Sequence, residues 1–274
     1  MCSDHTKNVL VEDVQISGHS HPISVRSYRT SVATPRQLPI VLYFHGGLFT
    51  SGSVSDATHA CTYLAIHTPA WVVSVDYSLA PQFPFPNALE DGFKALQWVL
   101  SEASSVRADK HRIAIAGEDA GGNIATCVSA LARDRGTGAL KAQVLLAPTL
   151  DPSLTHLATP DDPTSPSIDF LSDAYRAYLP TFMQRVHPYA APLESQRLQD
   201  LPPAYIVSVE GDAFRLEAER YASLLIASGV PTESVRAAGP TRKTLTGDDR
   251  ILRGASDFLR RRFEREGGTA TVLK

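Results

Sequence analysis

The sequence predicts an α/β fold with a mostly parallel sheet and helices on both faces. Short continuous apolar runs, as at residues 39–44 and 204–209, are typical of strands buried on both faces, and they alternate with amphipathic stretches. A Gly-rich corner at residues 117–123 separates an apolar run from a run of small residues, which predicts a strand, a sharp turn and a helix. Ligands of such folds bind at the carboxyl ends of the strands.

The elements follow from the hydrophobic pattern in chain order. Residues 9–16 and 23–28 alternate apolar and polar side chains around Gly18, which predicts an antiparallel hairpin at a sheet edge. Further strands are expected at 39–44, 71–76, 113–117, 144–148, 204–209 and 232–237. Helices are expected at about 54–67, 87–102, 216–228 and 248–264 and directly after the Gly-rich corner, with Asn87 as an N-cap.

The pattern changes between residues 151 and 187. This stretch is rich in Pro, Thr and Ser and then becomes amphipathic from 170 to 183. It predicts an inserted cap or lid rather than another strand and helix. The 274 residues, with 43% hydrophobic and 20% charged side chains, otherwise suit a single domain over residues 1–274.

Charge and cysteine usage limit the partners. The net charge is −3 and no long Lys or Arg run occurs, so neither a nucleic acid nor a membrane surface is indicated as a partner. The three cysteines, at positions 2, 61 and 127, are widely spaced and predict neither a disulfide framework nor a metal site. Residues 1–10 lack the apolar core of a signal peptide, so a cytoplasmic protein is expected. We expect a small-molecule ligand, no cofactor or metal, and possible homodimers.

The Gly-rich corner reads G-x-D-x-G, with Asp119 between Gly117 and Gly121. It differs by one residue from G-x-S-x-G, in which a serine nucleophile stands on a strained turn between a strand and a helix. Side chains at the glycine positions would clash in such a turn. The residue presented here is an aspartate.

Several segments in family order resemble the hormone-sensitive-lipase-like esterases of the α/β-hydrolase fold. They are residues 45–47 (His-Gly-Gly), 75–81, 83–86, 88–91, 117–123, 201–203, and Gly211-Asp212 followed by Glu217. The resemblance spans nearly the whole chain and implies an eight-stranded sheet. Because the segment before the first strand is short, it also implies a reduced cap and a more open pocket.

The resemblance locates three catalytic positions, two of which depart from the family. Members have Ser at the elbow, Asp after the seventh strand and His after the eighth, where this chain has Asp119, Asp212 and Arg242. The resemblance implies an oxyanion hole formed by the N–H groups of Gly46, Gly47 and Ala120.

Ester hydrolysis of the serine type needs a neutral oxygen nucleophile and a base, and neither occupies its family position here. Asp119 carries no proton to release at neutral pH, and Arg242 stays protonated. We therefore expect no turnover of p-nitrophenyl esters. Asp119 has three open roles: a general base or acid, a nucleophile as in the dehalogenases and epoxide hydrolases of this fold, or a partner in an ion pair with Arg242 and Asp212.

Other side chains are candidates for the pocket wall. The expected substrate-binding set is His45, Leu48, Phe49, Tyr77, Glu118, Phe182 and Tyr189. Core packing is an equally good interpretation of the aromatic members. A structural role is the usual one for His45, and Glu118 is expected to support the elbow.

The leading hypothesis is a small-molecule enzyme on this scaffold that does not hydrolyse esters. It would be a lyase, cyclase, dehydratase or isomerase of specialised biosynthesis, moving a proton through Asp119 with the carbonyl oxygen in the oxyanion hole. One alternative is a ligand-binding pseudo-hydrolase or receptor without catalysis. Another is a weak hydrolase with Asp119 as its nucleophile.

Overall fold

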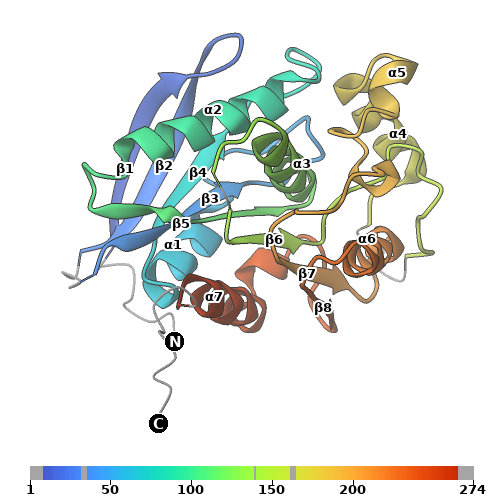
Figure 1. Cartoon of the computed structure of the whole chain (residues 1–274). Coiled ribbons are helices and arrows are strands. Elements are labelled where there is room, and N and C mark those ends of the chain that lie inside the picture. Colours follow the sequence, from blue (N-terminus) through green and yellow to red (C-terminus); the bar gives the residue numbers. More distant parts are fainter. Residues whose placement is uncertain (1–8, 32–35, 139, 161–164, 265–274) are drawn as a thin grey trace.

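A computed structural model describes residues 9–31, 36–138, 140–160 and 165–264. Its centre is one eight-stranded sheet with the order β1-β2-β4-β3-β5-β6-β7-β8 (Figure 1). The strands are β1 (Val9–Ser17), β2 (Pro22–Thr30), β3 (Leu38–Phe44), β4 (Trp71–Asp76), β5 (Ala108–Glu118), β6 (Ala142–Leu146), β7 (Ala204–Val209) and β8 (Thr232–Ala237).

The strand directions confirm the predicted sheet. β1 and β2 form the antiparallel edge hairpin, and β2 also pairs antiparallel with β4. All the other pairs, from β4 through to β8, are parallel. In this register Phe44 pairs with Gly117, and Glu118 pairs with Leu146. The carboxyl ends of β3, β5 and β6 therefore lie side by side, and the loops that follow them meet at one place.

Helices cover both faces of the sheet (Figure 1). Buried side chains of α2 (Asn87–Glu102), α3 (Ala120–Asp134) and α6 (Arg215–Ala227) share one apolar core. Those of α1 (Thr58–His67) and α7 (Asp249–Glu264) share the core on the other face. A core on each face explains why the central strands, such as β3, are buried along their whole length.

Two details of the predicted helices are wrong. α1 begins at Thr58 rather than near residue 54, because residues 54–57 form turns. Asn87 is the first residue of α2, not its N-cap. Its side-chain amide instead donates to the carbonyl of Pro84, within the Pro-rich loop before the helix.

The segment 151–187 contains the helices α4 (Ile168–Tyr178) and α5 (Phe182–Arg185) and, in its described part, no strand. α4 buries Leu171, Ala174, Tyr175 and Tyr178 against the body of the protein, and Tyr178 stacks on Phe49 with ring centroids 4.0 Å apart. That this segment acts as a cap stays a prediction. None of the described helices is long and apolar enough to span a membrane.

Candidate functional site

Asp119 lies in the turn between β5 and α3, with φ 52° and ψ −123°. Both flanking glycines are required by close backbone contacts. A Cβ at Gly117 would lie 2.2 Å from the carbonyl oxygen of Gly121, and a Cβ at Gly121 would lie 2.1 Å from that of Phe44. The predicted strained turn is therefore present, and it presents the Asp119 side chain beyond the end of the sheet.

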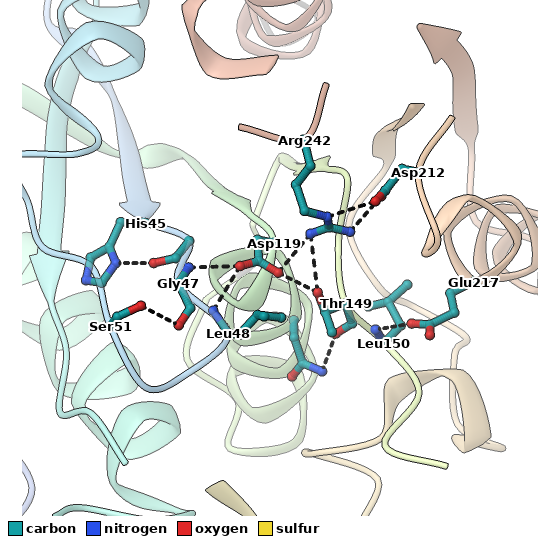
Figure 2. A network of polar contacts seen from close by, with 12 residues as sticks. His45, Gly47, Leu48, Ser51, Asp119, Thr149, Leu150, Asp212, Glu217 and Arg242 are labelled. Atoms are coloured by element: carbon teal, nitrogen blue, oxygen red, sulfur yellow. Dashed lines mark hydrogen bonds and ion pairs between the residues drawn. The ribbon is translucent and has the colours of Figure 1, made fainter. Parts of the chain in front are cut away.

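One carboxylate oxygen of Asp119 accepts two backbone hydrogen bonds. The N–H of Gly47 donates to Oδ2 at 2.8 Å, and the N–H of Leu48 donates to the same atom at 2.9 Å (Figure 2). Gly47 and Leu48 have φ of 122° and 50°, and these left-handed conformations turn two successive N–H groups toward one point. This N–H pair has the geometry of an oxyanion hole, and the carboxylate of Asp119 fills it.

The donors differ from the expected set. Gly47 was expected, whereas Leu48 was expected only as a side chain of the pocket wall. In the described part of the chain, no hydrogen bond joins the N–H of Gly46 or Ala120 to this carboxylate. The left-handed backbone of the 47–48 pair, which the sequence does not specify, accounts for the difference.

The other oxygen of Asp119 is also fully engaged. The hydroxyl of Thr149 donates to Oδ1 at 2.6 Å, and Nη1 of Arg242 donates to it at 2.8 Å. Arg242 also forms a bidentate pair with Asp212, through Nε at 3.2 Å and Nη2 at 2.8 Å (Figure 2). The ion pair between Asp119, Arg242 and Asp212, one of the open possibilities for Asp119, is thus present.

The three charged side chains of this ion pair are largely removed from solvent, with exposed fractions of 11% for Asp119, 13% for Arg242 and 2% for Asp212. Burial alone would lower the pKa of Arg242, but the carboxylates of Asp212 and Asp119 outweigh burial and raise it. The guanidinium also lies over the ring of Phe214, 4.2 Å from its centroid. Arg242 is therefore a fixed cation that cannot accept a proton.

A cavity of about 640 Å³ opens beside Asp119. Its wall combines apolar side chains with charged ones, among them Leu48, Pro166, Phe170, Asp56, Glu118 and Lys243. Pro166 and Phe170 belong to the segment 151–187, so this segment does reach the cavity. Charged and polar side chains outnumber the apolar ones in this wall, which suits a small organic ligand that carries polar groups.

Only two members of the expected substrate-binding set line this cavity, namely Leu48 and Glu118. His45 is fully buried and stacks on Tyr77, whose hydroxyl donates to the His45 carbonyl. Phe49 is buried against Tyr178. For these three residues, core packing is the correct interpretation.

The remaining two expected residues lie elsewhere. Phe182 is on α5 and is 75% exposed, and the hydroxyl of Tyr189 donates to Asp134. Phe182 was expected as the aromatic side chain of this segment at the pocket. Phe170 lines the cavity instead, because α4 rather than α5 borders it.

Several residues of the site were missed by sequence reasoning, and Thr149, Lys243 and Pro166 illustrate why. Thr149 follows the strand β6 and therefore stands at the carboxyl edge of the sheet, a position that marks it as a candidate. Lys243 and Pro166 line the cavity, but no local pattern distinguishes them from solvated loop residues.

The elbow, the N–H pair and the adjoining cavity define a site of the α/β-hydrolase class. A model of the alpha/beta hydrolase fold family Abhydrolase_3 matches residues 41–243. The chain belongs to this family.

Esterases are prominent among its relatives. The Esterase LipI of Mycobacterium tuberculosis is 39% identical over 81% of this chain and 71% of its own length, and an arylesterase of Saccharolobus solfataricus is 33% identical over 83% and 74%. In structure, the thermostable carboxylesterase EstE1 from a metagenomic library superimposes with a TM-score of 0.86 at 35% identity, covering 93% of this chain and 90% of its own.

These relatives correct the leading hypothesis. They are esterases and carboxylesterases, so the expected lyase, cyclase, dehydratase or isomerase activity is wrong, and hydrolysis is the indicated class of reaction. They also give no support to the expectation that ester hydrolysis is absent. The fold and sequence shared with these esterases over most of the chain indicate the reaction class more strongly than the residues at positions 119 and 242 do.

Glu217 is a buried carboxyl group next to the loop that carries Thr149. Its Oε2 accepts from the N–H groups of Leu150 and Asp151 at 2.7 and 3.0 Å, which fixes the loop that carries Thr149 (Figure 2). Its Oε1 is buried without a partner. Burial raises the pKa of Glu217 to about 8 from an ordinary 4.5.

The raised pKa of Glu217 makes stability depend on pH. Between about pH 4.5 and 8 the folded chain holds a proton at Glu217 that the unfolded chain has lost, so this contribution to stability falls as pH rises through that window. We expect the parent to lose stability relative to Glu217→Gln as the pH rises. The difference in free energy of unfolding, variant minus parent, should increase by a few kcal/mol from pH 5 to pH 9. Urea denaturation across this range, with the exposed Glu210→Gln as control, measures the change. Parallel curves for Glu217→Gln and the parent would contradict it.

Proposed function

We propose that this chain hydrolyses carboxylic esters slowly, with Asp119 as the nucleophile. The observation that carries the proposal is the Asp119 carboxylate itself, which stands on the elbow, beside an N–H pair and at the wall of the 640 Å³ cavity. The esterase activity named for the relatives supports the reaction class.

The proposed reaction has two steps. The Asp119 carboxylate first turns away from the N–H groups of Gly47 and Leu48, and the ester carbonyl oxygen takes its place. Asp119 attacks the carbonyl carbon, the C–O bond to the alcohol breaks, and the alkoxide leaves with a proton from water. Water then attacks the resulting mixed anhydride, which releases the acid and restores the Asp119 carboxylate. Since anhydrides are far more reactive than esters, the second step does not require a histidine.

We expect a low rate because the Asp119 carboxylate is held by several hydrogen bonds before it attacks. Asp119 must give up hydrogen bonds from Gly47, Leu48, Thr149 or Arg242 before it attacks. A carboxylate that accepts several charge-assisted hydrogen bonds is also a weaker nucleophile than a free one.

The test is the hydrolysis of p-nitrophenyl acetate. We expect slow release of nitrophenol above background, at least about tenfold less for Asp119→Asn, and an acyl adduct on the Asp119 peptide in acid-quenched samples. Asp173→Asn, on the exposed face of α4, is the control, and thermal melting verifies that each variant is folded. An unchanged rate for Asp119→Asn would overturn the proposal.

A second candidate is a binding protein without turnover, and it is favoured by the saturation of both Asp119 oxygens. In that case Asp119 serves to close the ion pair with Arg242 and Asp212, and the cavity alone takes the ligand. The test is whether an ester binds the parent and Asp119→Asn with equal affinity while neither protein hydrolyses it. That result would support a binding function over ester hydrolysis.

A further inference from the structure

Glu118 stands next to Asp119 at the end of β5 and lines the same cavity. The two side chains border one space beside Gly46, which lines the same cavity. A Cβ placed on Gly46 would lie 3.3 Å from Cγ of Glu118 and 3.4 Å from Oδ2 of Asp119. Glu118 is only partly exposed, so the cavity is its route to solvent. A ligand bonded to Asp119 would therefore lie near a second carboxyl group.

Glu118 has free hydrogen-bonding capacity, unlike Asp119. The hydroxyl of the buried Tyr43 donates to Oε1 over a long 3.4 Å, and Thr246, another residue of the cavity wall, lowers the pKa of the carboxyl group. A carboxylate can accept about four hydrogen bonds. Glu118 can thus accept a bond from a water molecule in the cavity.

The surroundings of Glu118 favour exchange of its proton near neutral pH. Burial is the main cause that raises its pKa to about 7; the side chains of Thr246 and Tyr43 oppose this rise, and the nearby carboxylates of Asp119 and Asp56 add to it. Other titratable or charged groups near it are Cys61 of α1, with which it interacts electrostatically, and Arg242 and Lys243, which line the same cavity. A base whose pKa lies near the working pH transfers protons efficiently.

We propose that Glu118 is the general base that activates water against the acyl group on Asp119 and so accelerates the second step of the reaction. This proposal rests on the proposed ester hydrolysis and adds a catalytic residue to it. Tyr43 is a positioning residue, because it bonds to Glu118 and does not line the cavity.

In the proposed step, water adds to the acyl group and Asp119 is the leaving group. The water oxygen forms a bond to the acyl carbon while its proton passes to the Glu118 carboxylate. The bond between the acyl carbon and the Asp119 oxygen breaks, and its electron pair returns to Asp119. The acid product leaves and ionises, and Glu118 releases its proton to solvent.

Single-turnover kinetics with p-nitrophenyl acetate test this role. In Glu118→Gln we expect the acyl adduct on Asp119 to form as in the parent and to decay at least about tenfold more slowly. Decay in the parent should accelerate with rising pH through a midpoint near 7, whereas decay in the variant should be independent of pH in that range. Added formate should restore part of the decay rate in Glu118→Ala, and Glu210→Gln is the matched control.

The outcomes separate the two proposals. An adduct that decays equally fast and with the same pH profile in parent and Glu118→Gln overturns the role of Glu118 and leaves Asp119 as the nucleophile. No adduct and no Asp119-dependent turnover in the parent overturns both. Slower decay without any change in pH profile and without rescue by formate reduces Glu118 to a structural residue, which also overturns the proposal.

Discussion

Replacing Asp119 by serine and Arg242 by histidine together should raise the rate of ester hydrolysis by at least about a hundredfold over the parent chain. The elbow, with φ 52° at position 119, already has the conformation that presents a serine hydroxyl. Serine is too short to fill the N–H pair of Gly47 and Leu48, so this pair becomes available for the oxyanion. Asp212, which now bonds to Arg242 at 2.8 Å, would orient the new histidine.

The two single variants are the controls for this expectation. Asp119→Ser alone leaves Arg242 in place and so has no base for the serine proton. Arg242→His alone leaves the Asp119 carboxylate in the oxyanion hole. The fold-increase in the initial rate with p-nitrophenyl acetate should therefore be much larger in the double variant than the product of the fold-changes in the two single variants. A folded double variant no faster than the singles would show that the retained scaffold is not poised for serine catalysis.

Arg242→Ala should lower the free energy of unfolding by about 3–5 kcal/mol, because it leaves two buried carboxylates without their shared cation. Asp119 and Asp212 are 11% and 2% exposed, so water cannot replace the lost guanidinium. For a chain of this length the loss corresponds to a fall of roughly 10 °C in melting temperature.

Calorimetry or urea denaturation measures the cost of Arg242→Ala, and two comparisons show where it comes from. Arg250→Ala removes an arginine that is 75% exposed and pairs with Asp248, so it should change stability by less than about 1 kcal/mol. In an Asp119→Asn/Asp212→Asn background, Arg242→Ala should be far milder, since no buried charge is then left unpaired. An equal penalty in both backgrounds would assign the effect to lost packing on Phe214 instead.

Most of the fold could be predicted from the sequence, because burial imposes periodic patterns. Strands buried on both faces, such as β3 and β7, must be apolar at every position, and their runs are visible without any structure. The elbow could be predicted because side chains at its two glycine positions would clash with the neighbouring backbone. The helix starts were less certain, as at Thr58 and Asn87, since the turns before them carry helix-compatible residues.

The site could be predicted only in part. Gly47, Asp119, Asp212 and Arg242 follow from motifs, and the structure brings all four together. Leu48 as an N–H donor, Thr149 as a partner of Asp119, and Phe170 rather than Phe182 at the cavity could not be predicted. Each depends on the direction of one loop or side chain, and local sequence does not fix such directions.

The aspartate at position 119 of the Gly-rich corner and the arginine at position 242 can be read directly from the sequence. How these two charged side chains interact depends on the tertiary structure. Residues 119, 212 and 242 are far apart along the chain, and the parallel sheet brings them to one edge, where burial forces opposite charges to pair. In the same packing, the N–H groups of Gly47 and Leu48 donate to Asp119. Glu118 lines the cavity, where its carboxyl group can bond to water.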